Sequence, residues 1–126
     1  MFSHVMLGAN DPAEVKPFYD ATLGALGAQP GFTDDKGRLV YMHNGAIFIV
    51  SKPIDDNPAC HANGGTVGFA AASPEAADAW HAAGVANGGT AIEDPPGVRE
   101  GGFGKLYLAY LRDPAGNKLC ALHRVA

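Results

Sequence analysis

Two side chains near opposite ends of the chain have the chemistry of catalytic groups, His4 and Cys120. A histidine can act as a general base or as a metal ligand because its charge changes near neutral pH. Cys120 would act as a nucleophile only with a lowered pKa and a base nearby. The alternatives are a hydrogen-bonded structural histidine and an inert buried thiol. Cys60 and His61 are adjacent but lack a second pair at metal-ligand spacing, so we expect them at the surface.

Four cations could hold an anionic group of a substrate: Arg38, Arg99, Arg112 and Lys118. The planar guanidinium of arginine forms paired hydrogen bonds with carboxylates. Arg99 lies in a glycine-rich segment and is the best placed of the four for a mobile ligand contact. Arg112 precedes an aspartate and could make only a local ion pair.

The composition fits one folded domain. The 126 residues, of which 47% are hydrophobic and 17% charged, suffice for one core and are too few for two ordinary domains. No apolar run reaches the roughly 20 residues of a membrane helix, and a net charge of −4 with scattered Lys and Arg argues against a nucleic-acid partner. Two cysteines, and an N-terminus without the pattern of a secretory signal, predict a cytoplasmic protein.

An internal repeat organises the elements that must position these side chains. Three pairs of residues, His4 and Thr66, Asp11 and Ser73, and Phe18 and Trp80, are each separated by 62 positions. Each copy reads as an apolar strand, a capping Asp or Ser, a proline at the first helical position, and a helix. The predicted helices cover about residues 12–24 and 74–87, with Phe18 and Trp80 as equivalent anchors on the sheet. Pro17 should loosen or kink the first helix.

Short strands follow each helix. In the first half they are predicted at 28–33, 38–43 and 46–52, with Asn44-Gly45 as the strongest hairpin signal. In the second half they are predicted at about 89–93, 105–112 and 118–124, and the glycine- and proline-rich segment 94–104 is predicted to be a flexible loop. Tyr107 and Tyr110 point to opposite faces of one strand, so one of them should line a cavity or an interface.

These motifs resemble the glyoxalase/bleomycin-resistance/dioxygenase superfamily, also called vicinal oxygen chelate proteins. The resemblance rests on three segments in order: 4–24, 63–69 and the terminal hairpin 112–119 with its Asp-Pro-x-Gly turn. It implies an α+β fold of two βαβββ modules, whose mixed sheet curls around a cupped cavity. We therefore expect one domain with module 1 at 1–53, a linker at 54–63 and module 2 at 64–126.

In metal-dependent members, as the resemblance implies, the first and last strands of each module hold one divalent ion, which stabilises an enediolate-like anion. The matching positions here are His4, Ile49, Thr66 and Cys120. Ile49 has no lone pair, and His4, Thr66 and Cys120 alone would make a poor site. We therefore expect no cofactor. Zn, Ni, Mn or Fe would bind only if other ligands, such as those of a partner chain, complete the site.

Strand alternation instead collects a mainly apolar face that suits a small-molecule pocket. The predicted pocket residues are His4, Met6, Ile49, Thr66, Gly68, Arg99, Tyr107, Lys118 and Cys120.

Three hypotheses follow from this sequence. The first is a bleomycin-resistance-like protein that binds a small organic molecule, with a degenerate metal site. The second is an enzyme, a metal-dependent lyase or isomerase similar to lactoylglutathione lyase, or a dioxygenase, with His4 and Cys120 as candidate catalytic residues. The third is a non-catalytic interaction module. Open sheet edges favour a homodimer in each case.

Overall fold

The computed structural model describes residues 1–125, and two helices begin where the capping signals predicted them. Helix α1 spans Pro12–Ala25, and the Asp11 carboxylate accepts a hydrogen bond from the Ala13 amide at 3.0 Å. Helix α2 spans Pro74–Ala86, and the Ser73 hydroxyl accepts one from the Ala76 amide at 3.1 Å. Each cap satisfies an amide that has no partner inside its helix. Helix α1 continues through Pro17 without a break.

The first sheet holds β1 (Val5–Gly8), β2 (Phe32–Thr33), β3 (Leu39–His43) and β4 (Ala46–Ser51) in the order β1-β4-β3-β2. Strand β1 is parallel to β4, and the other pairs are antiparallel. Asn44 and Gly45 close the β3–β4 hairpin with φ of 50° and 79°, as a two-residue turn of the mirror-image type requires. The predicted hairpin is confirmed. The strand predicted at 28–33 is shortened to its last two residues.

The second sheet repeats this plan with one addition. It holds β5 (Val67–Ala70), β6 (Thr90–Ala91), β7 (Gly97–Gly101), β8 (Gly104–Arg112) and β9 (Lys118–Arg124). The order is β5-β9-β8-β6, and β7 pairs with the other end of β8. The prediction of a flexible loop at 94–104 was wrong, because the nine residues of β8 extend far enough to pair β7 along five positions.

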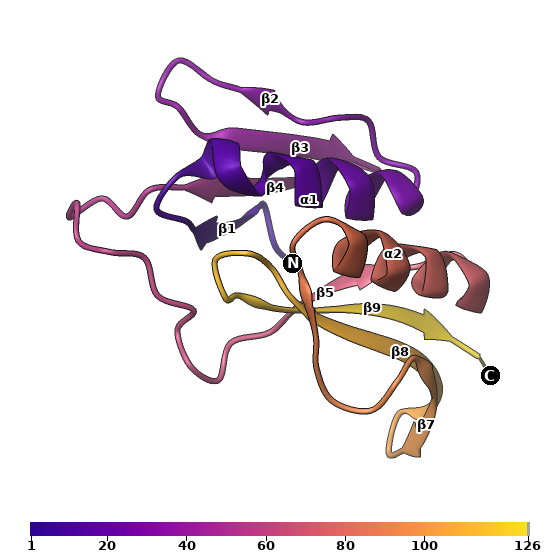
Figure 1. The fold of residues 1–126 in the computed structure, drawn as a ribbon. Coiled ribbons are helices and arrows are strands. Elements are labelled where there is room, and N and C mark those ends of the chain that lie inside the picture. Colours follow the sequence, from indigo (N-terminus) through magenta and orange to yellow (C-terminus); the bar gives the residue numbers. More distant parts are fainter. Residues whose placement is uncertain (126) are drawn as a thin grey trace.

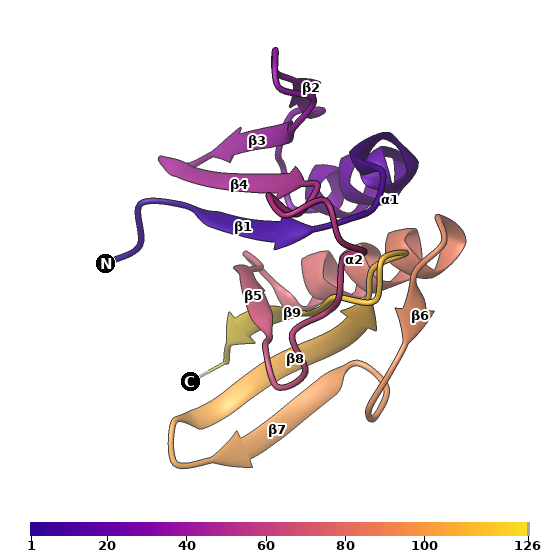
Figure 2. The same cartoon turned by 90° about the vertical axis from the view of Figure 1, so that its left-hand side faces the viewer.

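The two modules lie one above the other, each with its helix beside its own sheet (Figure 1). Figure 2 shows α1 and α2 on the same side of the molecule, and β1 and β5 as the strands of the two sheets that lie nearest to each other. Within residues 1–125 no backbone pairing joins the sheets. The predicted α+β fold of paired βαβββ modules is confirmed, with two separate mixed sheets in place of a continuous one.

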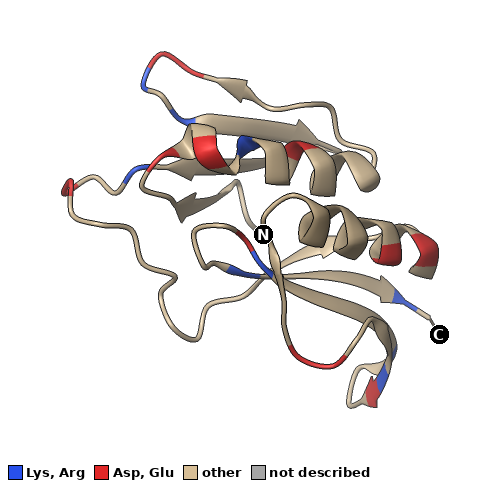
Figure 3. Ribbon diagram, viewed as in Figure 1, with Lys and Arg blue, Asp and Glu red and all other residues tan. Residues whose placement is uncertain are grey.

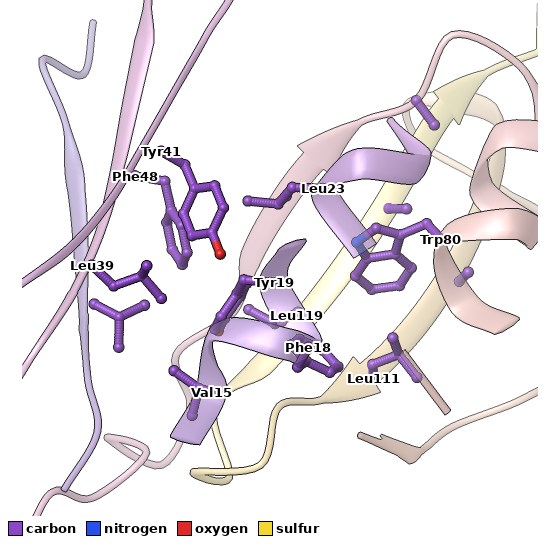
Figure 4. Packing of buried hydrophobic residues seen from close by; sticks show 14 of the residues in the cluster. Val15, Phe18, Tyr19, Leu23, Leu39, Tyr41, Phe48, Trp80, Leu111 and Leu119 are labelled. Carbon is purple, nitrogen blue, oxygen red and sulfur yellow. The ribbon is translucent and has the colours of Figure 1, made fainter. Parts of the chain in front are cut away.

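A single hydrophobic core joins the modules (Figure 4). Phe18 and Trp80, the predicted anchors, are both fully buried in it. The ring of Phe48 on β4 lies 5.3 Å from that of Phe69 on β5, so the first sheet contacts the second directly. One face of each sheet is therefore turned toward the common core, and the other face is turned away from it.

A buried polar network also ties the modules together at the turn between β8 and β9. The Asp113 carboxylate accepts hydrogen bonds at 2.9 Å from the amides of Ala115 and Asn117 and from the Asn117 side chain. It also accepts one from the hydroxyl of Tyr19 on α1. The Asn117 side-chain amide donates to the Gly8 carbonyl oxygen at the end of β1 at 3.0 Å. The Asp-Pro-x-Gly turn thus contacts both the first strand and the first helix.

Candidate functional site

The face of the first sheet that turns away from the core is apolar and open to solvent. The strand pairing sets Ile49 between Met6 and Val40, and sets Met42 beside Ile47. Met6 is 44% exposed and Met42 60% exposed. We call this surface the first outer face; its residues are Met6, Phe32, Val40, Met42, Ile47 and Ile49. Exposed apolar patches of this kind are typical of ligand or protein contacts.

The corresponding face of the second sheet combines an apolar centre with ionisable groups. Cys120 lies between Gly68 and Tyr110, and Leu122 lies between Ala70 and Leu108. We call this surface the second outer face; its residues are Gly68, Ala70, Arg99, Leu106, Leu108, Tyr110, Arg112, Lys118, Cys120, Leu122 and Arg124. Leu108 and Cys120 are buried although they lie outside the common core. This face is therefore a packed surface in its own right.

The four positions at which the resemblance expects metal ligands are divided between the sheets. His4 directly precedes β1, is exposed, and has its Nδ1 atom 2.8 Å from the Ser3 hydroxyl oxygen. Ile49 lies on the same sheet, in the middle of the first outer face. Thr66 directly precedes β5 and is exposed, whereas Cys120 is buried in the second sheet.

This donor set does not fit a divalent ion. Ile49 is a hydrocarbon, and its cross-strand neighbours Met6 and Val40 supply no oxygen, nitrogen or thiolate ligand. Within residues 1–125, no three His, Cys, Asp or Glu side chains are grouped as a metal site would require. Burial raises the pKa of the Cys120 thiol, and nearby Glu93 raises it further, while Lys118 opposes them. A thiol held in its protonated form is a poor nucleophile and a poor metal ligand.

Ionisable side chains gather around Tyr110 on the second outer face. The Lys118 ammonium pairs with the Glu93 carboxylate and lies 5.2 Å from the centre of the Tyr110 ring. Burial raises the pKa of the Tyr110 phenol, with smaller contributions from Cys120 and Glu93, while Lys118 and Arg99 lower it. At neutral pH Tyr110 therefore offers a neutral hydroxyl that can donate a hydrogen bond.

Tyr107 lies elsewhere than predicted. It is on the opposite face of β8, and its hydroxyl donates to the Asp78 carboxylate of α2 at 2.7 Å. Its grouping with Cys120 and Lys118 was therefore wrong. Tyr110 takes that place, because the β8–β9 turn sets position 110 directly opposite position 120. Counting outward from the Asp-Pro-x-Gly turn would have given this pairing from the sequence.

Arg99 lies on β7, opposite Leu106, and so belongs to the same side of the sheet as Tyr110. Sequence reasoning selected Arg99 but missed Glu93, which lies in the segment between β6 and β7 and has a φ of 58°. No sequence signal marks Glu93, because positive φ is rare for glutamate and nothing local predicts it.

The structure also holds a groove that the sequence did not indicate. It has a volume of about 540 Å³ and lies between the end of α1, the β3–β4 hairpin and β5. Its walls come from core-side residues such as Leu23, Phe48 and Phe69, and Gly68 is the predicted pocket residue that it includes. A wider hollow of about 1090 Å³ beside the first sheet includes Met6. Apart from Tyr107, which lies on the opposite face of β8, the predicted pocket residues are thus divided between the two modules instead of lining one closed cavity.

Comparison with known proteins gives a consistent result. The family model described as the Glyoxalase/Bleomycin resistance protein/Dioxygenase superfamily matches residues 1–121. The chain is similar to the crystal structure of a glyoxalase/bleomycin resistance protein from Albidiferax ferrireducens T118, with 60% identity, a TM-score of 0.95, and coverage of 98% of this chain and 99% of that chain. No curated protein matched.

More distant structures share the fold alone. A glyoxalase/bleomycin resistance protein/dioxygenase family enzyme from Burkholderia phytofirmans PsJN has a TM-score of 0.72 at 18% identity, covering 95% of each chain. A lactoylglutathione lyase from Agrobacterium tumefaciens has a TM-score of 0.67 at 19% identity, covering 97% of this chain and 92% of that chain. Within the residues that the structure describes, no helix is long and apolar enough to cross a membrane.

Proposed function

The chain belongs to the glyoxalase/bleomycin resistance protein/dioxygenase superfamily, and from this premise we propose that it binds a small organic molecule against its outer faces without a catalytic metal. The observation that carries the proposal is the position of Ile49. A carboxylate or an imidazole there would serve a metal, but Ile49 is a half-buried apolar side chain between exposed Met6 and buried Val40. Such a surface favours apolar ligands, by about 25 cal/mol for each Å² that they cover.

We further propose that a second copy of the chain completes the site. The residues of each outer face come from a single sheet, so a molecule bound to one face alone would stay partly in water. In a two-fold dimer, the first outer face of one copy could cover the second outer face of the other, and symmetry would create two equal cups. The complementary character of the two faces, one apolar and one with charged groups around an apolar centre, supports this arrangement.

Catalysis by a metal-dependent lyase has no comparable support in the chain's own residues. The similarity to a lactoylglutathione lyase is at 19% identity and concerns the fold. The resemblance places His4 at a ligand position, yet the residues at the other three positions do not form a donor set.

A thermal-shift screen of small organic molecules in the presence of EDTA tests ligand binding. We expect several ligands with apolar bodies to raise the melting temperature of the metal-free protein. Met42→Lys places a charge on the first outer face and should abolish these shifts. Val85→Lys, which changes an exposed residue of α2, is the matched control and should leave the shifts unchanged.

Two further measurements complete the test. Light scattering should give the mass of a dimer for the protein and for Val85→Lys, and of a monomer for Met42→Lys. Metal analysis of the purified protein should show less than one divalent ion per chain. A stoichiometric ion that is lost in His4→Ala, together with no shift from any ligand in EDTA, would overturn the proposal.

A further inference from the structure

Positive charge is concentrated on one side of the second sheet. Four of the nine Lys and Arg residues are placed there by the strand pairing: Arg112 lies opposite Lys118, and Arg99 and Arg124 each lie opposite Leu106. Glu93 pairs with one of them, Lys118. The chain as a whole carries a net charge of −4, so this local excess is opposite in sign to the total. Figure 3 shows the basic positions along β7, β8 and β9.

The first outer face lacks this charge. Its strand positions are methionine, isoleucine, valine and phenylalanine. The strand positions of the two outer faces therefore differ, although Lys36, Arg38 and Lys52 line the hollow beside Met6 in the first module. Electrostatic attraction by the second outer face would act on one part of a ligand, and apolar contact on the remainder.

The Arg99 guanidinium is held in place by backbone carbonyl groups and not by a carboxylate. Its Nη2 atom donates to the carbonyl oxygens of Asp94 and Pro95 at 3.0 and 3.1 Å. Its Nη1 atom passes close to Gly97, 3.4 Å from where a Cβ atom would stand. The four ion pairs found among residues 1–125 do not include Arg99. The guanidinium is therefore oriented by uncharged groups and keeps N–H donors for a ligand.

Lys118 is oriented by two different contacts. Glu93 pairs with its ammonium group, and the Tyr110 ring lies beneath it at 5.2 Å. Glu93 adopts a φ of 58°, in the left-handed region that glutamate rarely enters, and strained residues of this kind tend to occur at functional sites. The same side chain thus fixes Lys118 and limits the net positive charge of the face. Between Arg99 and Lys118, the two cations and the Glu93 carboxylate leave an excess of one positive charge, which a group with a single negative charge would balance.

We propose that the second outer face binds the carboxylate of a small organic acid between Arg99 and Lys118. Tyr110 donates a hydrogen bond to the carboxylate, and the apolar body of the ligand lies over Leu122, beside the buried Leu108. This inference rests on the proposed function, since it names the ligand class of the same site. It adds that a neutral compound of equal shape binds less well than the acid.

Matched pairs of ligands test the charge requirement directly. Phenylacetate and phenylacetamide, cinnamate and cinnamamide, and 1-naphthoate and 1-naphthamide differ in charge and little in shape. Calorimetric titration of the full chain should give about tenfold or greater preference for an acid over its amide, as for a charge-assisted hydrogen bond. Raising the salt concentration from 50 to 500 mM should reduce this preference.

Variants of one hairpin then locate the site. Arg99→Gln should weaken the acids by about tenfold or more and leave the amides unchanged. Arg99→Lys, which keeps the charge but not the planar fork, should recover part of the loss. Lys105→Gln is the matched control, because Lys105 lies on the same β7–β8 hairpin, pairs with Glu100 and belongs to the opposite face. It should leave both acids and amides unchanged.

The possible failures are distinguishable. If acids and amides bind equally and Arg99→Gln changes neither, the anion site is refuted while ligand binding stands. If Lys105→Gln weakens the binding of the acids as much as Arg99→Gln does, the acids are attracted by the overall positive charge and the specific anion site is refuted. If acids, amides and the neutral compounds of the wider screen all fail to bind, both the anion site and the proposed function are refuted.

Discussion

Removing one buried hydroxyl should measure how strongly the β8–β9 turn holds the modules together. Tyr19→Phe deletes the hydroxyl that donates to Asp113 and keeps the aromatic ring in the core. Both residues are buried, at 0% and 3% exposure. Asp113 retains its bonds from Ala115 and Asn117, so the substitution removes a single interaction and leaves no unpaired carboxylate.

The expected loss follows from the nature of this bond. A hydrogen bond to a charged group contributes about 1.5–3 kcal/mol to stability, and burial of both partners excludes water as a replacement. We therefore expect Tyr19→Phe to lower the free energy of unfolding by about 2 kcal/mol. For a domain of this size, that corresponds to a decrease in melting temperature on the order of 6–10 °C.

Tyr107→Phe provides the control, since it deletes the same kind of bond at the surface. The Tyr107 hydroxyl donates to Asp78 in a solvent-accessible position, where the change should stay within about 0.5 kcal/mol. Urea titrations followed by circular dichroism give both free energies from the midpoint and the slope. Equal losses in the two variants, or a loss below 0.5 kcal/mol for Tyr19→Phe, would refute the reasoning.

Three further outcomes can be checked with simple measurements. Gly84→Ala should lower the free energy of unfolding, measured in urea, by about 1–3 kcal/mol, because the new methyl group would overlap the Leu111 side chain of β8. Gly24→Ala should raise it by about 0.5–1 kcal/mol, because nothing lies within 4 Å of the new Cβ atom and alanine favours the helix. Burial and the Asp20 carboxylate raise the pKa of Tyr41 in the folded protein. Because the unfolded chain therefore loses the Tyr41 proton first, the free energy of unfolding should fall as the pH rises above about 10. A free energy of unfolding that stays constant from about pH 9 to 12 would contradict the raised pKa of Tyr41. A thiol reagent at pH 8 should modify exposed Cys60 at least about tenfold faster than buried Cys120, whose pKa is raised; equal rates by mass spectrometry would contradict the burial.

Features with a local cause were predictable from the sequence. The capping side chains and prolines at 11–12 and 73–74 determine where the helices begin, and both helices end within one residue of the predicted position. Asn44-Gly45 determines the first hairpin because its two residues tolerate positive φ. The sharing of one face by Met6 and Ile49, and of another by Gly68 and Cys120, follows from strand alternation once the pairing is fixed.

Features that depend on distant contacts were not predictable. The glycines of β7 favoured the prediction of a loop. The strand forms because one edge of β8 is available to pair with it. The prediction from the sequence also placed the pocket residues on one surface. How two modules dock depends on the packing of α1 on α2 and of Phe48 on Phe69, which no periodicity encodes. His4, directly before β1, and Cys120 on β9 belong to different modules, whose strands form separate sheets.

The two modules share a fold, but the side chains on their outer faces differ, and this difference determines what the candidate site can bind. A repeat that kept the same side chains on both outer faces would present two equivalent surfaces, and either could bind alone. Here the first face is a hydrocarbon surface around Ile49, and the second holds Arg99 and Lys118 around Tyr110. A molecule with an apolar body and one anionic end would use both surfaces only if a cup brings them together. The dimer and the anion site are therefore linked: Met42→Lys should weaken acids and amides alike, whereas Arg99→Gln should weaken the acids only.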